Sequence, residues 1–443
     1  MVFELKREQR LGPVGFFTCV MCINLFAILA IDMYAPALPS MQQSFDVSIG
    51  YLNLTMFAFF FVSAFATFFA GPVSDVVGRR PVIIVSTIFF AAASIGCALS
   101  PSVEVLVAFR VLQGAGLGGI QSLVTAIVQD AFDESSVQKA MTFMQSLIII
   151  GPVLAPFLGS FILTFSDWRG IFALLGVLGV ASVALSLSIR GTHEVERGGG
   201  VSFGGLMGKT LGDCRALMSD RAFASLTLIL GFAGVPFFAF IAVVSYIAID
   251  FFELGYLGYS LIYAVVCLID CVAPFAYLAL SKRFPSKHIL RLSFGLIAVT
   301  GVVLTFAGTI SPVVFTIGFA FYALAEGVIR PLAFVVLLDQ PEDRVGSASS
   351  LANFTYIIIT AIATVIATLD WPNLVFGVGV ITLATFAVSV ALYAWGLAGR
   401  RDRCARPLRS VNQNDLASMA HDLAPMAHAK RVMQPPPTTM SPS

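Results

Sequence analysis

An acidic residue ends the first long apolar stretch of the chain. That stretch starts near Phe16 and runs into residues 32–39, which read DMYAPALP. An ionisable group inside a membrane helix costs roughly 2.5–3.5 kcal/mol on insertion scales, so it marks a functional site by default. Two prolines three residues apart remove backbone donors beside the acid, and Tyr34 adds an aromatic hydroxyl. Asp32 and Tyr34 are therefore candidate groups for binding a proton and a substrate.

Four more charged side chains interrupt apolar runs. Arg110, three residues before Gln113, needs a partner or a wet cavity, so it either takes part in proton transfer or forms a strut with Gln113. Glu326 and Arg330 lie i, i+4, a spacing at which helical side chains meet. They are either a self-neutralising pair between helices, or they face a cavity where Glu326 contacts a cationic or polar substrate. Asp270 has no partner nearby in sequence, and it either pairs with Arg330 across helices or titrates.

The elements that must position these groups are membrane helices. The chain has 443 residues, of which 58% are hydrophobic and 12% are charged, against roughly 25% charged in soluble domains. A bilayer-spanning helix needs about 20 apolar residues, and runs of that length recur throughout. Hydropathy predicts an all-α integral membrane protein with twelve transmembrane helices. The predicted spans are about 14–38, 49–71, 81–100, 103–127, 136–164, 168–190, 221–249, 256–280, 288–309, 312–337, 346–369 and 372–397.

A hydrophilic middle segment divides these spans into six and six. We expect a cytoplasmic N-terminus over 1–13, a six-helix bundle over 14–190, a cytoplasmic central loop over 191–220 and a second six-helix bundle over 221–397. Residues 398–443 are too polar and proline-rich to form a core, which predicts a disordered cytoplasmic tail. Two bundles around a hydrophilic loop are typical of transporters with a site between the bundles.

Basic residues fix the orientation. They gather in the N-terminus, the loops after spans 2 and 8, the central loop and the start of the tail, whereas the opposite loops contain one, Arg169. The positive-inside rule therefore places both termini in the cytoplasm. On this orientation Asp32 lies about 16 residues past Phe16, roughly 24 Å along the helix. That is the outer half of the bilayer.

The loop after span 2 carries a specific pattern of glycines and charges. Its residues are Gly71, Asp75, Gly78, Arg79 and Arg80. The spacing resembles the loop signature of the major facilitator superfamily. The resemblance implies the major facilitator fold and a gating role for this loop without substrate contact. Asp75 would favour the inside-closed state by meeting the N-terminal end of span 11, near Gly346.

Two further motifs narrow the resemblance to the drug:proton antiporter branch. Arg110-Val111-Leu112-Gln113-Gly114 in span 4 matches a motif in which the arginine is associated with proton transfer. In span 5, two prolines bend the helix between two glycines, and the pattern implies a hinge and seal at the bundle interface that marks exporters. The span-5 residues are Gly151, Pro152, Pro156 and Gly159.

Residues 32–39, 168–172 and 346–351 point to one subfamily, because they resemble signatures of Bcr/CflA-type multidrug resistance transporters. The resemblance covers about residues 14–397 and is looser in the second half. The end of span 7, at 245–253, is altered. Asp270, Glu326 and Arg330 belong to no such signature, which leaves the substrate open.

The motifs together predict a proton-coupled secondary transporter that exports small lipophilic or cationic compounds by alternating access. Asp32 and Arg110 would couple protons, and Tyr34, Gln113, Tyr246, Asp270, Glu326 and Arg330 would line the substrate cavity. We expect no cofactor beyond the proton gradient and no metal. The expected partners are a small molecule, protons and lipid, with no nucleic acid, for a monomer in a bacterial inner membrane that confers antibiotic resistance.

Two alternatives remain. One is proton-coupled uptake or exchange of a metabolite or siderophore, which the fold also allows. The other is a non-transporting membrane receptor, although such a protein has no reason to bear the insertion cost of the acid and arginines. No nucleophile–base constellation occurs, so the sequence indicates no enzyme. Because Asp32 lies off centre, it suits a coupling acid, and the deeper Glu326 and Arg330 suit the substrate side.

Overall fold

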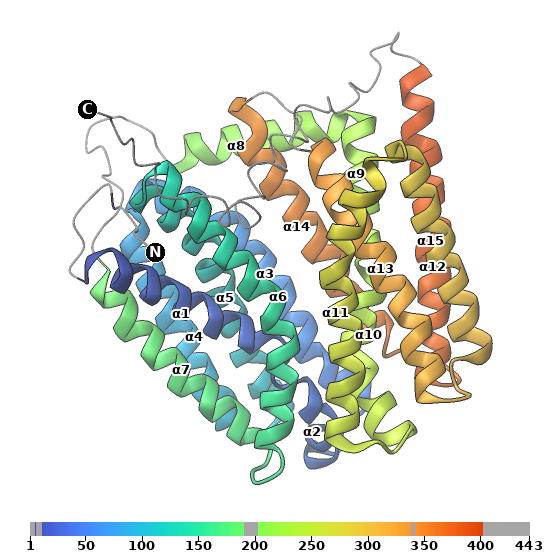
Figure 1. Ribbon diagram of the computed structural model, residues 1–443. Helices are drawn as coiled ribbons and strands as arrows, with labels where there is room; N and C mark the ends of the chain where they lie inside the picture. The colour runs from blue at the N-terminus through green and yellow to red at the C-terminus, as the bar shows by residue number, and fades with distance from the viewer. Residues whose placement is uncertain (1–4, 6–10, 190–202, 338–341, 402–443) are drawn as a thin grey trace, which may run out of the picture. The chain divides into compact units, whose positions relative to one another are not determined.

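The computed structural model describes residues 5, 11–189, 203–337 and 342–401, and almost all of these residues are helical (Figure 1). The predicted tail from 402 onward and linker residues 191–202 lie outside the described residues. The first half of the chain contains α1 (Gly12–Asp32), the 3₁₀ turn η1 (Ala35–Ala37), α2 (Leu38–Phe45), α3 (Ile49–Val77), α4 (Arg79–Ala98), α5 (Val103–Ala131), α6 (Glu134–Ile162) and α7 (Trp168–Ser188).

The second half follows a linker helix, α8 (Phe203–Ser219). It contains α9 (Arg221–Ala233), α10 (Val235–Ser245), the π-helical turn η2 (Tyr246–Phe251), α11 (Gly255–Ser281), α12 (Ser286–Ala307), α13 (Pro312–Leu337), α14 (Glu342–Ile366) and α15 (Leu374–Arg401). Residues 1–396 form one compact unit, and a second unit begins at Leu397.

Most predicted spans coincide with long apolar helices. The described residues contain eleven helices or helix runs that are long and apolar enough to cross a membrane. The predicted span at 136–164 falls on α6, of which the stretch Ile150–Ile162 is apolar but short. The structure therefore shows an all-helical membrane protein with eleven candidate spans.

The helices pack mainly within each half of the chain. In the first half α5 packs against α3 and α4, and α4 packs against α7. In the second half α13 packs against α11 and α12, and α14 against α9 and α10. The two halves meet where α3 packs against α14 and α6 against α11. The halves also meet where η1 contacts α10 and α11, and side chains from both halves can share a site along these contacts.

Two predicted spans are interrupted helices. Span 1 ends as a regular α-helix at Asp32, and Pro36 and Pro39 then lie at the starts of η1 and α2. Proline is tolerated in the first turn, where its missing N–H needs no partner. Span 7 breaks at Gly234 between α9 and α10. Broken helices at membrane depth are tolerated only where other protein groups satisfy the freed backbone.

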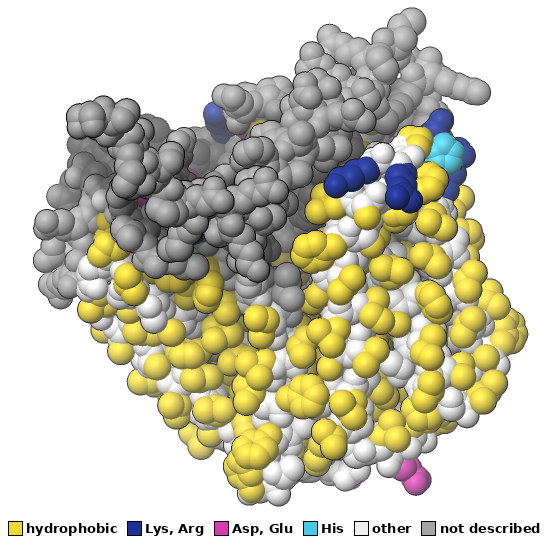
Figure 2. All heavy atoms as spheres, viewed as in Figure 1, with side chains coloured by type: hydrophobic (Ala, Val, Ile, Leu, Met, Phe, Trp, Pro, Cys, Tyr) yellow, Lys and Arg dark blue, Asp and Glu magenta, His cyan; other side chains and the backbone are white. Residues whose placement is uncertain are grey.

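The surface is largely hydrophobic, as the apolar composition of the chain predicts. Figure 2 shows hydrophobic side chains over most of the visible face, with Lys and Arg side chains gathered at the rim where α11 and α12 connect. The connecting residues Lys282, Arg283 and Lys287 are all exposed. A lipid-facing band with a basic rim is the distribution expected of a membrane protein with basic residues on one side.

Candidate functional site

Asp32 is the last residue of α1, and its side chain is buried with 4% exposed. The hydroxyl of Tyr263, on α11, donates a hydrogen bond of 2.9 Å to Asp32 Oδ1. Tyr263 is itself fully buried, and its ring lies 5.9 Å from the rings of Tyr259 and Phe240. The acid of the first half is thus held by an aromatic hydroxyl of the second half.

Arg110 lies in the first third of α5 and is completely buried. Its Nη1 donates to Gln113 Oε1 at 2.6 Å, and Gln113 Nε2 donates to Ser94 Oγ at 2.8 Å. The guanidinium also lies 3.9 Å from the centre of the Phe59 ring and 4.2 Å from that of Tyr34. The strut between Arg110 and Gln113 therefore exists, and cation–π contacts stabilise its charge.

Some polar atoms of this site make no hydrogen bond within the described residues. Arg110 Nε, Arg110 Nη2 and the Tyr34 hydroxyl are buried and make no hydrogen bond within the described residues. Buried polar atoms are nearly always satisfied by protein or by ordered water. Free donors on Arg110 beside the Tyr34 hydroxyl therefore fit a place for water or for a polar substrate group. Tyr34 follows Asp32 by two residues, so the acid and the arginine belong to one region.

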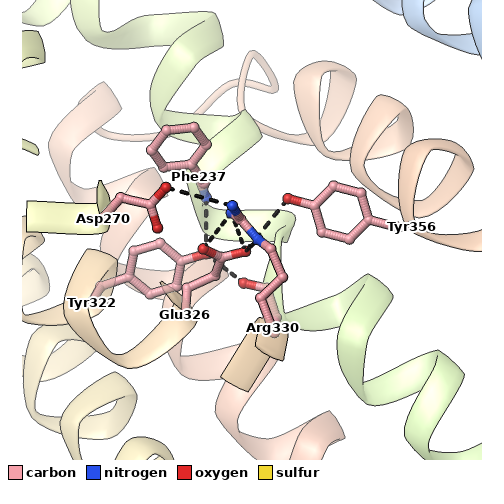
Figure 3. Close-up of polar contacts among 7 residues, drawn as sticks. Phe237, Asp270, Tyr322, Glu326, Arg330 and Tyr356 are labelled. Atoms are coloured by element: carbon pink, nitrogen blue, oxygen red, sulfur yellow. Dashed lines mark hydrogen bonds and ion pairs between the residues drawn. The ribbon is translucent and has the colours of Figure 1, made fainter. Parts of the chain in front are cut away.

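A second charged cluster lies between α11, α13 and α14 (Figure 3). Arg330 binds Glu326 through Nε (3.1 Å to Oε1) and through Nη2 (2.7 and 2.6 Å to the two oxygens). Arg330 Nη1 lies 3.6 Å from Asp270 Oδ2, and the Tyr356 hydroxyl lies 3.4 Å from Glu326 Oε1. Glu326 pairs with Arg330 as the i, i+4 spacing predicts, and Arg330 is the partner of Asp270 across helices.

The break between α9 and α10 is bridged by a side chain that the sequence analysis missed. The Tyr322 hydroxyl, on α13, donates to the Ala233 carbonyl oxygen and accepts from the Phe237 N–H at 3.2 Å. A regular helix would join these two backbone groups directly, because they are i and i+4. A side chain inserted into the hydrogen-bond ladder is a known cause of a helix kink. Gly234-Val235-Pro236 was the sequence signal for this break.

The glycine–proline motif predicted for span 5 lies on α6, and this helix packs against both α1 and α11. A Cβ on Gly159 would overlap the Met33 carbonyl oxygen, and one on Gly151 would overlap the Ile28 side chain. Ser160 Oγ lies 2.8 Å from Ser260 Oγ on α11. The helix continues through Pro152 and Pro156. The glycines let α6 approach the backbone that follows Asp32, so the motif positions the acid at the seam between the halves.

The glycine- and charge-rich motif between α3 and α4 is held within the first half. Arg79 Nη1 pairs with Asp75 at 2.5 Å, and Arg79 Nε pairs with Asp130 of α5 at 3.0 Å. Gly78 has φ +101°, a backbone conformation that glycine adopts without strain, and this allows α4 to follow α3 at once. Arg80 donates to the Leu187 carbonyl of α7 at 3.2 Å.

The expected contact between Asp75 and the start of α14 is not among the contacts of the described residues. Instead Asp213 of α8 accepts from Ser347 Oγ at 3.4 Å and lies 3.9 Å from Arg344 Nε. A carboxylate near a helix N-terminus is favourable, so α8 supplies the acid that was expected from the loop. A Cβ on Gly346 would meet open space, and one on Gly71 would make an ordinary contact with Ser122.

Tyr246, at the start of η2, lies apart from the charged cluster. It borders a pocket of about 320 Å³ that is also lined by Asp250 and Asn373. Its hydroxyl is buried and makes no hydrogen bond within the described residues. Tyr246 also interacts electrostatically with Tyr34, so the expected cavity residues fall into two places, one around Arg110 and one around Arg330.

Gly159 offers a test of the close approach of α6 to α1. We expect Gly159→Val to lower the melting temperature of the purified protein, because the added atoms overlap the Met33 carbonyl, and overpacking typically costs about 1–3 kcal/mol. Gly205→Ala on α8 is the matched control, since its Cβ would meet open space. Equal melting temperatures for wild type and Gly159→Val would show that the two backbones are not in contact.

These observations define a multi-pass helical membrane protein in which a buried acid of the first half, Asp32, bonds to a tyrosine of the second half. The model of the Major Facilitator Superfamily matches residues 20–364. The chain belongs to this superfamily. It is therefore a transporter of small molecules and not an enzyme.

The relatives support the same assignment. The chain is 28% identical over 351 residues to "Uncharacterized MFS-type transporter YdgK" of Bacillus subtilis (strain 168), covering 77% of this chain and 86% of that protein. It is 28% identical over 291 residues to "Multidrug transporter MdfA" of Edwardsiella ictaluri (strain 93-146), covering 65% of this chain and 70% of the relative. The predicted resemblance to Bcr/CflA-type transporters is confirmed as a distant relationship.

Solved structures show the same fold. A peptide transporter solved in complex with sulfate superposes with a TM-score of 0.69 at 15% identity, covering 89% of this chain and 97% of the other. A D-xylose-proton symporter gives a TM-score of 0.65 at 17% identity, covering 87% and 95%. At these identities the likeness concerns the fold alone.

Proposed function

We propose that this protein exports small lipophilic or cationic compounds in exchange for protons. The observation that carries the proposal is the hydrogen bond from Tyr263 to the buried Asp32, which joins the two halves of the chain through a titratable group. Its distant relatives include proteins named multidrug transporters. We accordingly infer that the activity is drug efflux and that the substrates are small lipophilic or cationic drugs.

The geometry suggests how a proton could drive the cycle. A hydroxyl that donates to an ionised carboxylate makes a stronger hydrogen bond than one that donates to a neutral acid. Protonation of Asp32 would therefore weaken its contact with Tyr263 and remove a negative charge that holds a cationic substrate. Both effects favour separation of α1 from α11, and deprotonation on the opposite side would restore the contact. Arg110 and Tyr34 would provide polar groups along the path of the proton beside Asp32.

The fuller topology is part of the same proposal. It comprises twelve spans in two six-helix bundles, both termini in the cytoplasm and a monomer in the bacterial inner membrane. The exposed basic residues between α11 and α12 favour a cytoplasmic location for that end. Asp75, Arg79 and Arg80 would gate the cytoplasmic side, and Gly151, Pro152, Pro156 and Gly159 would seal the seam beside Asp32.

Direction of flux tests this function. We expect purified protein in liposomes with an acidic lumen to accumulate ethidium, because protons leaving the lumen would drive the cation in. A lumen more alkaline than the outside should expel ethidium. Ethidium has a fixed charge, so a pH gradient alone does not concentrate it, and liposomes without protein provide the baseline. Accumulation in an alkaline lumen would instead indicate symport, the mechanism of proton-coupled uptake.

A further inference from the structure

The cluster around Arg330 contains one more negative group than positive group. Glu326 takes all three of the short contacts that Arg330 makes. Asp270 lies 3.6 Å from the remaining Arg330 nitrogen, and its Oδ1 is buried and accepts no hydrogen bond from the residues that the structure describes. With both acids ionised, the cluster would carry a net negative charge inside the membrane region. Such a charge is expensive unless something neutralises it.

The neighbouring side chains do not provide that compensation. The other titratable groups that interact with the two acids are uncharged thiols and phenols. They are Cys267 and Cys271 on α11, Tyr322 on α13 and Tyr356 on α14. The Tyr322 hydroxyl already bridges the break between α9 and α10. Within the described residues Arg330 is the one cation that forms an ion pair with Asp270 or Glu326.

A metal ion does not fit the cluster. The described part of the chain contains no group of three or more His, Cys, Asp and Glu side chains placed to hold a metal. A hard cation such as Mg²⁺ or Ca²⁺ takes about six to eight oxygen ligands, many more than two acids shared with an arginine supply. A proton needs one carboxylate oxygen. Two neighbouring carboxylates that cannot both ionise share a proton, which makes the titration a property of the pair.

We propose that Asp270 and Glu326 share one exchangeable proton, forming a second proton-binding site in addition to Asp32. Asp32 lies on α1, whereas Asp270 and Glu326 lie on α11 and α13. The two proton-binding sites therefore lie in different halves of the chain. The shared proton has a consequence for transport, and this one step rests on the proposed antiport: two protons move for each substrate molecule.

Exposure indicates where the proton enters. The Glu326 side chain is 1% exposed, but those of Asp270 and Arg330 are 16% and 38% exposed. Gly327 allows the Asp270 carboxylate to lie close to α13, because a Cβ at residue 327 would lie 2.8 Å from Asp270 Oδ1 and 2.5 Å from the Ala273 Cβ. Asp270 is the more exposed of the two acids, so we infer that the proton exchanges through Asp270.

Infrared spectroscopy of the purified protein tests the proton site without any transport. In an Asp32→Asn background we expect a carbonyl band of a protonated carboxylic acid that disappears when the pH is raised. Asp270→Asn and Glu326→Gln should each abolish this band, because either variant leaves one carboxylate balanced by Arg330 and should fold. Asp270→Glu should retain it. Glu104→Gln, at an exposed acid bonded by Tyr51, is the matched control and should change nothing.

Persistence of the same titrating band in both Asp270→Asn and Glu326→Gln would overturn the proposal, as would its absence from the Asp32→Asn protein at every pH. Transport then tests the stoichiometry. With ethidium as the substrate, wild type should exchange two protons for one cation and move net charge, so its flux should respond to an imposed membrane potential. Asp270→Asn should exchange one proton for one cation, move no net charge and give a flux that the potential does not change. One proton in both would refute the coupling step. If wild type moves no ethidium, the proposed function fails, and the infrared result still decides the proton site.

Discussion

Asp32→Asn is expected to abolish proton-driven efflux while the protein still inserts and folds. Asparagine has nearly the same shape and can still accept the hydrogen bond from Tyr263, but it cannot bind and release a proton. Removal of the only acid at this position of α1 should leave substrate binding measurable and uphill transport at the level of empty liposomes. Ethidium accumulation under an imposed pH gradient measures the loss, and the elution profile of the detergent-purified protein checks folding.

Two variants separate the proton from the hydrogen bond. Tyr263→Phe removes the donor but leaves the acid, so we expect reduced transport that remains dependent on the pH gradient. Glu104→Gln neutralises an exposed acid elsewhere in the first half and should transport normally. The assignment of Asp32 as the coupling acid would be wrong if Asp32→Asn pumped ethidium as well as Glu104→Gln does.

Arg330→Met is expected to produce the largest loss of stability. It leaves Glu326, which is 1% exposed, and Asp270 without their shared cation. Removal of one partner of a buried ion pair typically costs about 3–5 kcal/mol, because an uncompensated charge stays buried. That figure is an upper bound here, since the Arg330 side chain is 38% exposed and the buried partner is Glu326. The melting temperature in detergent, measured at constant pH, should fall clearly. Since protonation can relieve the remaining acids, the loss should be smaller in acidic than in alkaline buffer.

A second substitution tests whether the loss of stability in Arg330→Met comes from the uncompensated charge or from lost packing. Adding Glu326→Gln to Arg330→Met removes one of the two stranded acids and should recover much of the lost melting temperature. Arg344→Met is the control on the surface, because Arg344 is 44% exposed and lies 3.9 Å from Asp213. Exposed pairs contribute about 0–1 kcal/mol, so this variant should melt close to wild type. Equal losses for Arg330→Met and Arg344→Met would contradict a structural role for the buried cluster.

The sequence predicted the helices well because length and hydropathy determine them locally. Most helix ends lie within a few residues of the predicted spans. The i, i+4 spacing was sufficient for the pairing of Glu326 with Arg330, since that contact lies within one helix. The helix α8 was not predicted, because it lies in a stretch with weak apolar character and four glycines, Gly204, Gly205, Gly208 and Gly212.

Contacts across the chain could not be predicted in the same way. Tyr263 lies 231 residues from Asp32, and no local pattern distinguishes it from the other aromatic residues of an apolar helix. Asp75 was expected to meet the N-terminal end of span 11, near Gly346, but a carboxylate next to two arginines can equally pair within its loop. In the structure Arg79 holds it, and Asp213 occupies the position at α14. Such choices depend on tertiary packing.

The bridge formed by Tyr322 has a mechanical consequence. Its hydroxyl occupies the break between α9 and α10, while Glu326 projects from the next turn of the same helix, α13. A rotation of α13 would therefore change the charged contacts and the bend of the neighbouring helix together. Because α10 also provides the Ala242 carbonyl that accepts from Asn53 of α3 at 3.3 Å, the bend is connected to the first half of the chain. The stiffness of this joint is set by a phenol from another helix, which can release the backbone without breaking a covalent or ionic link.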